Sequence, residues 1–248
     1  MDRNTAKEVL ERFLSFDITA SKEVLDEFAS LPRAVVHRDG GKENFVYVPG
    51  TRKDRVLLVA HADTVWDASY GNGEGYKQTL TEKDGIYSGR KNDCGIGADD
   101  RAGCAILWLL KDSGHSLLVV DGEEFGQIGS HHIKDRYPHI FDELNAHSYM
   151  IQFDRREHMN YKVYTLPVTQ EFLLFVAGNT GYYNSGVFSR TDIVVLCRDI
   201  CGVNLSIGYY NEHSPDESLV FDEWFTTLTV AEKLLAPEQK RFPLKRRR

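Results

Sequence analysis

The sequence predicts an α/β protein: a single three-layer α/β/α domain around a mostly parallel central sheet. Three observations predict this fold class. Strand-like apolar runs alternate with segments whose apolar residues recur at helical spacing. Two of the strand-like runs are apolar almost throughout, as the buried strands of a parallel sheet are. The chain has 248 residues and is 42% hydrophobic, enough for one core of that size. Such alternation covers both faces of a sheet with helices.

Each element follows from its own periodicity. Residues 167–178 have a strand-like composition, but Phe172, Phe175 and Val176 recur at helical spacing after Pro167, which favours a helix. The predicted strands span residues 44–48, 55–63, 84–89, 115–124, 148–154 and 202–208. The predicted helices span residues 5–16, 21–31, 99–113, 129–144 with a break near Pro138, 167–178 and 216–236.

Charge and composition exclude several classes of protein. The chain has 30 Lys and Arg against 37 Asp and Glu, and this net charge of −7 argues against nucleic-acid binding. The charged, amphipathic N-terminus does not read as a signal peptide, and no apolar stretch approaches the roughly 18 residues that span a membrane. The 4 cysteines form no C-x-x-C pair, which indicates reduced thiols in a cytoplasmic protein.

The chain reads as one domain, residues 1–237, followed by a short basic tail, residues 238–248. No repeat, low-complexity segment or Pro/Gly-rich linker divides it. The tail ends in the basic run RFPLKRRR, which we expect to be frayed and solvated. A weak contact of this tail with nucleic acid or lipid is the alternative.

Polar side chains collect where the predicted strands end. In a parallel sheet, ligands bind outside the carboxyl ends of the strands. The set gathered there exceeds the three protein ligands of a catalytic mononuclear zinc site. It suits two metal ions about 3.5–4 Å apart, bridged by a carboxylate and a water. Its members are His61, Asp63, Asp99, Glu123, Glu124, Asp154 and His213.

Each of these motifs has an ordinary structural explanation when taken alone. A lone His-x-Asp is usually a satisfied histidine, and adjacent glutamates usually lie on a solvated face. Asp99 and Asp100 could simply cap a helix and complement its dipole. The joint pattern is more specific, because HAD, GADDRAG, DGEE, FD and NEHSP occur in this order, each beside an apolar strand.

The segments LLVAHADTVW, GADDRAGCA and VDGEEFGQIGS make the chain resemble the co-catalytic di-zinc exopeptidases. This family includes peptidase T, the carboxypeptidase G-like enzymes and secreted bacterial leucyl aminopeptidases, and the resemblance covers roughly residues 55–235. It implies two divalent metal ions as cofactors, zinc being the expected one. One ion would be held by His61, Asp99 and Asp154, and the other by Asp99, Glu124 and His213.

The resemblance also implies roles for the remaining residues. Asp63 resembles the carboxylate that holds the second nitrogen of His61. Glu123 resembles the general base, whereas Glu124 resembles a metal ligand. In this family the peptide bond after the bridging aspartate is typically cis, so we expect a cis peptide between Asp99 and Asp100.

The chain departs from the peptidase T branch of that family in one respect. The intervals from His61 to Asp99 and from Asp154 to His213 are too short for the separate lid domain of that branch. That lid usually supplies an oxyanion donor and an arginine for the substrate carboxylate. The sequence offers replacements, each of which could instead be a core, rim or ion-pair residue. They are Tyr182, Tyr183, Tyr209 and Tyr210 as donors, and Arg190 as the cation.

The leading hypothesis is a di-zinc aminopeptidase or dipeptidase that hydrolyses small peptides, with Glu123 as general base. One alternative is an amidohydrolase that deacylates N-acyl amino acids, since the same metals would serve it. Another is an inactive peptide-binding relative. The complete ligand set argues against the similar one-zinc glutaminyl cyclases. The glycine-rich loops at residues 70–76 and 179–186 are expected to border an open site. The oligomeric state is left open.

Overall fold

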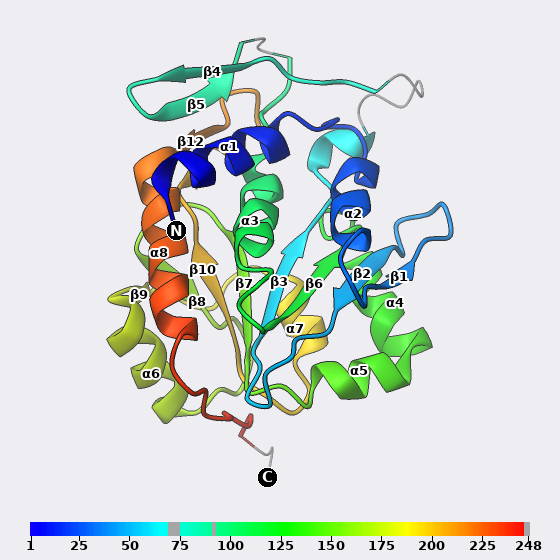
Figure 1. Ribbon diagram of the computed structural model, residues 1–248, viewed down its shortest axis with the longest axis vertical. Coiled ribbons are helices and arrows are strands. Elements are labelled where there is room, and N and C mark those ends of the chain that lie inside the picture. The colour runs from blue at the N-terminus through cyan, green and yellow to red at the C-terminus, as the bar shows by residue number, and fades with distance from the viewer. Residues whose placement is uncertain (69–74, 91–92, 246–248) are drawn as a thin grey trace.

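A computed structural model of the protein describes residues 1–68, 75–90 and 93–245. Its centre is an eight-stranded sheet with the order β1-β2-β6-β3-β7-β10-β8-β9 (Figure 1). The four middle strands, β6, β3, β7 and β10, are parallel to one another, whereas β2 and β8 pair with them antiparallel. The strands are β1 (Val35–His37), β2 (Phe45–Val48), β3 (Leu57–His61), β6 (Ser116–Val120), β7 (Met150–Arg155), β8 (Asn160–Lys162), β9 (Tyr183–Asn184) and β10 (Gly202–Ser206).

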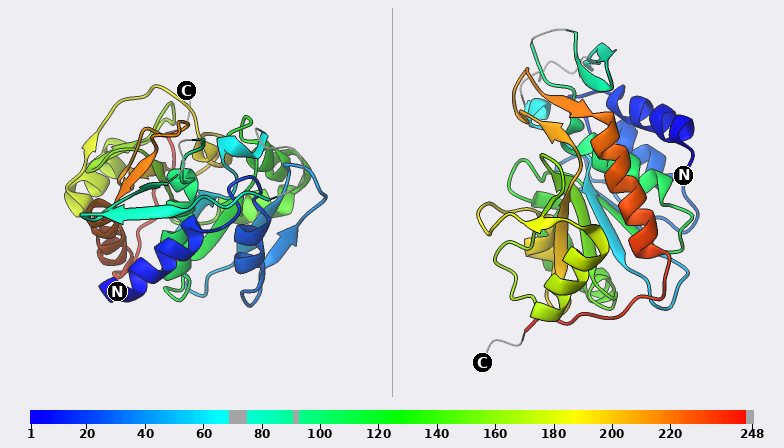
Figure 2. Two further views of the ribbon diagram at one scale, coloured as in Figure 1. Left: turned by 90° about the horizontal axis from the view of Figure 1, so that it is seen from above. Right: turned by 90° about the vertical axis from the view of Figure 1, so that its left-hand side faces the viewer.

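Helices cover both faces of this sheet (Figures 1 and 2). Successive strand residues point to opposite faces, so Leu58 and Ala60 belong to one core and Leu57 and Val59 to the other. The first core packs against α1 (Arg3–Leu14), α2 (Lys22–Ala29), α3 (Ala98–Leu109), α6 (Gln170–Thr180) and α8 (Phe221–Leu235). The second packs against α4 (Ile128–Arg136), α5 (Pro138–Leu144) and α7 (Asp192–Leu196). The predicted three-layer α/β/α fold is therefore confirmed.

A second, smaller sheet lies beyond the edge toward which the central strands point (Figure 1). Its order is β11-β12-β5-β4, all antiparallel. The strands are β4 (Leu80–Lys83), β5 (Ile86–Gly89), β11 (Tyr209–Tyr210) and β12 (Ser218–Val220). The sequence predicted only the β5 segment. The pairing matters for the site because the β11–β12 loop carries His213.

Most predicted elements lie where the periodicity placed them. The helical segment broken at Pro138 forms α4 and α5. The segment at residues 167–178, which has a strand-like composition, forms α6, and the side chain of its N-cap residue Thr169 accepts the Phe172 N–H. The last helix begins at Phe221 rather than at residue 216, because residues 218–220 pair with β5. A 3-10 helix, η1 (Val65–Ala68), follows β3.

The expectation of a disordered C-terminal tail is wrong for residues 238–245. Phe242 is only 2% exposed and packs against Phe172 and Phe175. Its backbone N–H donates to Ser148 O, and its carbonyl accepts the Cys201 N–H. The apolar side chain within the basic run therefore fastens this segment to the domain. Residues 246–248 lie outside the described residues.

Two further observations concern the helices and the cysteines. Within the described ranges, none of the helices has the length and apolar character that a bilayer crossing requires. The four cysteines, Cys94, Cys104, Cys197 and Cys201, are buried free thiols.

Candidate active site

The seven predicted site residues converge at the carboxyl edge of the central sheet. His61 ends β3, Glu123 and Glu124 follow β6, and Asp154 lies near the end of β7. Asp99 lies in the first turn of α3, and His213 comes from the β11–β12 loop. Residues that are far apart in sequence therefore meet because parallel strands end at the same edge.

The first group of possible metal ligands consists of His61, Asp99 and Asp154. The His61 Nε2 atom lies 3.1 Å from Asp99 Oδ1 and 3.5 Å from Asp154 Oδ1. The side chains of His61, Asp99 and Asp154 are 1%, 9% and 9% exposed. Two largely buried carboxylates thus face one buried imidazole nitrogen.

The second group consists of Asp99, Glu124 and His213. The His213 Nε2 atom lies 3.2 Å from Asp99 Oδ2 and 2.9 Å from Glu124 Oε1. Asp99 therefore belongs to both groups and turns one carboxylate oxygen toward each histidine. This is the arrangement that a carboxylate bridging two ions requires.

The donor set fits two divalent ions on three grounds. Neutral imidazole nitrogens and carboxylate oxygens are common zinc ligands, and a tetrahedral ion with bonds of about 2.0–2.1 Å separates its ligand atoms by about 3.3 Å. The four interatomic distances above, from 2.9 to 3.5 Å, are close to that value. Glu124 Oε1 is buried and makes no hydrogen bond in spite of the nearby His213 nitrogen. A buried acceptor without a donor is costly unless a cation satisfies it.

Asp63 connects the histidine to the glutamate loop. Its backbone carbonyl lies 3.1 Å and its Oδ1 atom 3.4 Å from His61 Nδ1. The same carboxylate accepts the backbone N–H of Glu123 (3.2 Å) and of Glu124 (3.1 Å). Asp63 is fully buried, and so it positions His61 and both glutamates without lying in either ligand group.

The adjacent glutamates have different surroundings. Glu124 belongs to the second ligand group, whereas Glu123 belongs to neither. The Glu123 Oε1 atom accepts a hydrogen bond from Gln127 Nε2 at 3.2 Å. Burial raises the pKa of Glu123 well above its usual value, and the charge of Asp154 adds to this rise. Burial also raises the pKa of Glu124 to about 7. Both carboxylates favour the protonated form unless positive charge lies beside them.

Asp100, the residue after Asp99, holds the end of β3 and the start of α3 together. The peptide bond between Asp99 and Asp100 is cis, as the family resemblance predicted. Asp100 accepts the backbone N–H groups of His61 and Gly103, at 3.1 Å each. It is buried, and it joins the end of β3 to the start of α3.

Sequence reasoning missed Glu217. This residue is 1% exposed and accepts three backbone N–H groups from the turn that leads into α3. Its Oε2 atom accepts from Ile96 (2.8 Å) and Gly97 (2.7 Å), and its Oε1 atom accepts from Asp99 (3.0 Å). Burial raises its pKa to about 8. The available signal was its place in HSPDESLV, four residues after the predicted ligand His213.

Polar residues in the central strands and at the start of α7 were also missed. Thr191 Oγ1 donates to Asp154 Oδ2 at 2.7 Å, and Gln152 Nε2 donates to the same oxygen at 3.0 Å. Asn204 accepts the Asp154 N–H at 2.9 Å. The completely buried Asp192 accepts from Gln152 and from Ser130. Gln152 and Asn204 interrupt otherwise apolar runs, and that interruption could have indicated them.

A pocket of about 360 Å³ opens onto both ligand groups. The buried Tyr209 lines it, and the Tyr209 hydroxyl lies 3.4 Å from Asp154 Oδ1. Burial raises the pKa of Tyr209 well above its usual value, so its hydroxyl stays protonated and able to donate. Arg190 also lines the pocket, and it makes no hydrogen bond or ion pair within the part of the chain that the structure describes. These are two of the five substrate-binding candidates that the sequence offered.

The remaining candidates lie elsewhere. The Tyr182 hydroxyl is hydrogen-bonded to Thr227 in the core, and the Tyr210 hydroxyl donates to Glu223. Tyr183 is 60% exposed on β9. The pocket is bordered by residues 188–191, just beyond the predicted rim loop at residues 179–186. The other predicted rim loop, residues 70–76, lies mostly outside the described residues.

No protein-family profile matches the chain, and no curated protein sequence matches it. Solved structures do resemble it. The aminopeptidase PepT from Bacillus cereus superposes with a TM-score of 0.67 at 13% identity, covering 95% of this chain and 98% of that one. A tripeptidase from Staphylococcus aureus gives 0.66 at 12% identity, with the same coverage of both chains. An aminopeptidase from the archaeon Desulfurococcus kamchatkensis gives 0.64 at 13% identity and covers 96% of each chain. At these identities the similarity shows a shared fold: the chain has the fold of these peptidases.

Proposed function

We propose that the protein is a metallopeptidase that uses two divalent ions, zinc in the first place, to hydrolyse short peptides. The observation that carries this proposal is Asp99, whose two carboxylate oxygens face His61 and His213 at 3.1 and 3.2 Å. Asp154 and Glu124 complete the two groups. The fold shared with several peptidases supports the same reading.

The proposed chemistry divides the work between the ions and the protein. Metal ions held by these residues would supply Lewis-acid polarisation of the scissile carbonyl and would lower the pKa of the attacking water. Glu123 takes the proton of the attacking water and passes it to the leaving amine. Gln127 orients the Glu123 carboxylate through the hydrogen bond to its Oε1 atom. Asp63 keeps Glu123 and Glu124 in place by accepting both of their backbone N–H groups.

Two residues of the pocket are suited to the substrate. The protonated Tyr209 hydroxyl can donate a hydrogen bond to the oxygen that gains charge during attack. The unpaired Arg190 can hold a carboxylate in a two-pronged hydrogen bond. A free carboxylate held in the same pocket as both ligand groups suits a short peptide, and we therefore propose a dipeptidase or an aminopeptidase for small peptides.

The proposal includes the organisation and location of the enzyme. Residues 1–237 would act as one catalytic domain without a separate lid, since the small sheet itself supplies His213 from the β11–β12 loop. The four buried free thiols fit a reducing compartment, so we place the enzyme in the cytoplasm.

A panel of substrates tests this function. Zinc-loaded protein should release amino acids from dipeptides and tripeptides, and removing the metal with a chelator should abolish the release. Faster cleavage of N-acyl amino acids than of any peptide would favour the amidohydrolase alternative. Binding of peptides without turnover, under full metal loading, would identify an inactive relative and overturn the proposal.

A further inference from the structure

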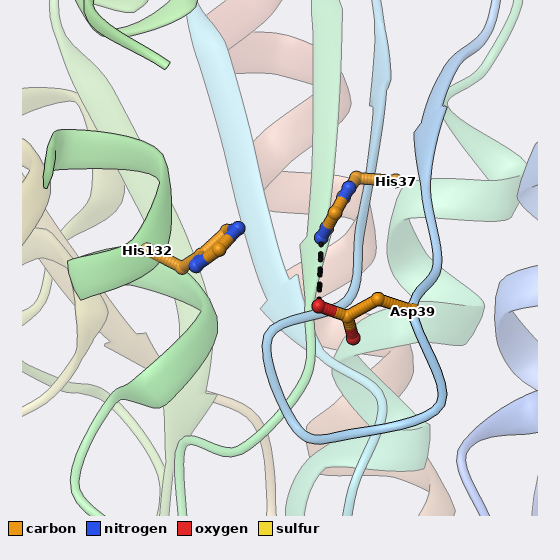
Figure 3. Close-up of side chains that lie close together, drawn as sticks. All are labelled: His37, Asp39 and His132. Atoms are coloured by element: carbon orange, nitrogen blue, oxygen red, sulfur yellow. Dashed lines mark ion pairs between the residues drawn. The ribbon is translucent and has the colours of Figure 1, made fainter. Parts of the chain in front are cut away.

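A second cluster of possible ligands lies away from the residues described above, where β1 meets α4. It consists of His37 at the end of β1, Asp39 in the loop that follows, and His132 on α4 (Figure 3). One ligand atom from each residue lies within 4.8 Å of the other two. His37 Nε2 and Asp39 Oδ2 are 3.4 Å apart, close to the roughly 3.3 Å between ligands of a tetrahedral zinc ion.

His37 is held as a metal-binding histidine usually is. Its Nδ1 atom lies 2.7 Å from the Tyr137 hydroxyl, a hydrogen bond that fixes the ring and leaves Nε2 free. Ligating histidines characteristically use their second nitrogen in this way. The ring is stacked against Phe45 on one side, with centroids 5.5 Å apart, and against His132, with centroids 4.8 Å apart. These contacts fix the ring's orientation.

The free nitrogen of His37 lacks a partner. Its Nε2 atom is buried and makes no hydrogen bond, although Asp39 Oδ2 is 3.4 Å away. The His132 ring, drawn beside it in Figure 3, offers a second nitrogen to the same space. A buried ring nitrogen without a hydrogen bond is unfavourable in a folded protein, and a cation that it shares with Asp39 would satisfy it.

We propose that His37, Asp39 and His132 bind one transition-metal ion, zinc in the first place. Two imidazoles and one carboxylate suit zinc, nickel or copper rather than magnesium or calcium, which prefer oxygen ligands. Asp39 is half exposed, so water can occupy the fourth position. This site is independent of the proposed peptidase chemistry.

The ion would fasten the β1–β2 loop to α4. The backbone N–H of Asp39 donates to Asn44 Oδ1 (3.2 Å), and Asn44 Nδ2 donates to Asp121 Oδ2 (2.9 Å). Asp121 stands directly before Gly122 and Glu123. A metal ion bound at His37 would therefore stabilise the β1–β2 loop, which is hydrogen-bonded through Asn44 to the segment that carries Glu123. The role of this ion would be structural.

Metal counting on matched variants tests the proposal. After equilibration with zinc, His132→Ala and Asp39→Asn should each hold one ion per chain fewer than the wild type. The control is His131→Ala, which removes an exposed neighbour on the same helix that is not in the cluster. It should hold as many ions as the wild type. Because the result is a difference, it does not depend on how many ions the candidate active site binds.

Two further measurements sharpen the test. Tyr137→Phe should keep the ion count at saturating zinc but weaken its binding about 10–100-fold, as the loss of an orienting hydrogen bond does. Zinc should raise the melting temperature of the wild type more than that of His132→Ala. Magnesium should change the melting temperatures of the two proteins by the same amount. Equal ion counts in the wild type, His132→Ala and Asp39→Asn would overturn the proposal, as would the loss of an ion in His131→Ala.

Discussion

Glu123 and Glu124 are neighbours in sequence, yet their surroundings assign them different work. Glu124 Oε1 lies 2.9 Å from His213 Nε2 and makes no hydrogen bond, which suits a metal ligand. Glu123 is oriented by Gln127 and belongs to neither ligand group. Burial raises the pKa of each carboxyl, so each needs nearby positive charge to remain ionised.

Exchanging each glutamate for glutamine separates these two roles. Glu123→Gln keeps the shape of the side chain but cannot accept a proton, so activity should fall by roughly 10²–10⁴-fold while both ions remain bound. Glu124→Gln should weaken metal binding at the His213 side instead. Metal content and turnover are measured for both variants. Loss of metal from Glu123→Gln together with retention in Glu124→Gln would mean that the roles are reversed.

Glu217 offers a second test at the scale of one residue. In Glu217→Gln, the amide NH2 group that replaces one carboxylate oxygen cannot accept the backbone N–H groups bound there, so buried N–H groups lose their acceptor. We expect zinc-loaded protein to lose about 1–3 kcal/mol of unfolding free energy. It should also bind metal more weakly, because the turn that positions Asp99 is held less firmly. Urea unfolding and metal titration measure both. The exposed neighbour Asp216, changed to Asn, should alter stability by less than about 0.5 kcal/mol. A Glu217→Gln variant as stable as Asp216→Asn would refute this role.

The site was more predictable than its supports, for a physical reason. Five of the predicted residues follow apolar runs: His61, Asp63, Glu123, Glu124 and Asp154. The parallel strands that these runs predict must end at one edge. The structure brings these five together with Asp99 and His213, while metal binding by the five proposed ligands stays a prediction. Glu217 acts through backbone N–H groups, and such acceptors carry no sequence pattern of their own. Gln152 and Asn204 left a visible trace only as polar breaks in apolar strands.

At the scale of elements, local pattern identified the long strands and helices but not the small sheet. Its strands have two to four residues each, too few for a periodicity to show. It also pairs β5 with β12, which are remote in sequence, and no local signal reports such a pairing. The prediction of a solvated C-terminal segment was wrong for a related reason. The basic residues of RFPLKRRR favoured a solvated tail, and Phe242 alone gives no periodic pattern that would predict its packing.

Phe242 provides the element-scale prediction. Its side chain packs with Tyr149, Phe172 and Phe175 at centroid distances from 4.8 to 5.8 Å. Phe242→Ala should therefore cost about 3–5 kcal/mol of unfolding free energy, the usual loss for a buried phenylalanine. Phe188→Ala is the control, since that side chain is 85% exposed and should contribute less than about 0.5 kcal/mol. Chemical denaturation compares the two; equal stabilities would show that the segment is not anchored.

At the scale of the whole molecule, the fold concentrates buried acids at one edge of a chain that is already acidic. Burial raises the pKa of Glu124 and of Asp192 to about 7 and that of Glu217 to about 8, against ordinary values of 4.5, 3.8 and 4.5. The adjacent carboxylates of Asp99 and Glu124 raise the pKa of His213 to about 11. Without metal, the folded protein therefore binds more protons than the unfolded chain between about pH 5 and pH 8.

This proton balance predicts the pH dependence of stability. A carboxyl whose pKa is raised by folding contributes its stability below the unfolded value and loses it as pH rises through the folded value. A histidine with a raised pKa acts in the same direction. Metal-free protein should thus become less stable from pH 5 to pH 8. The difference in unfolding free energy between zinc-loaded and metal-free protein should grow over this range, because the ions stabilise the deprotonated ligands. Urea unfolding of both forms across this range measures the difference. Metal-free protein that gains stability over this range would contradict the assignment.

The most direct test of the two-ion site is anomalous diffraction at the zinc edge from crystals of zinc-loaded protein. We expect two peaks about 3.5–4 Å apart. Asp99 should contact both ions, with His61 and Asp154 on one and Glu124 and His213 on the other, and Glu123 should contact neither. A single peak at this edge of the sheet, or two peaks that do not share Asp99, would contradict the two-ion site.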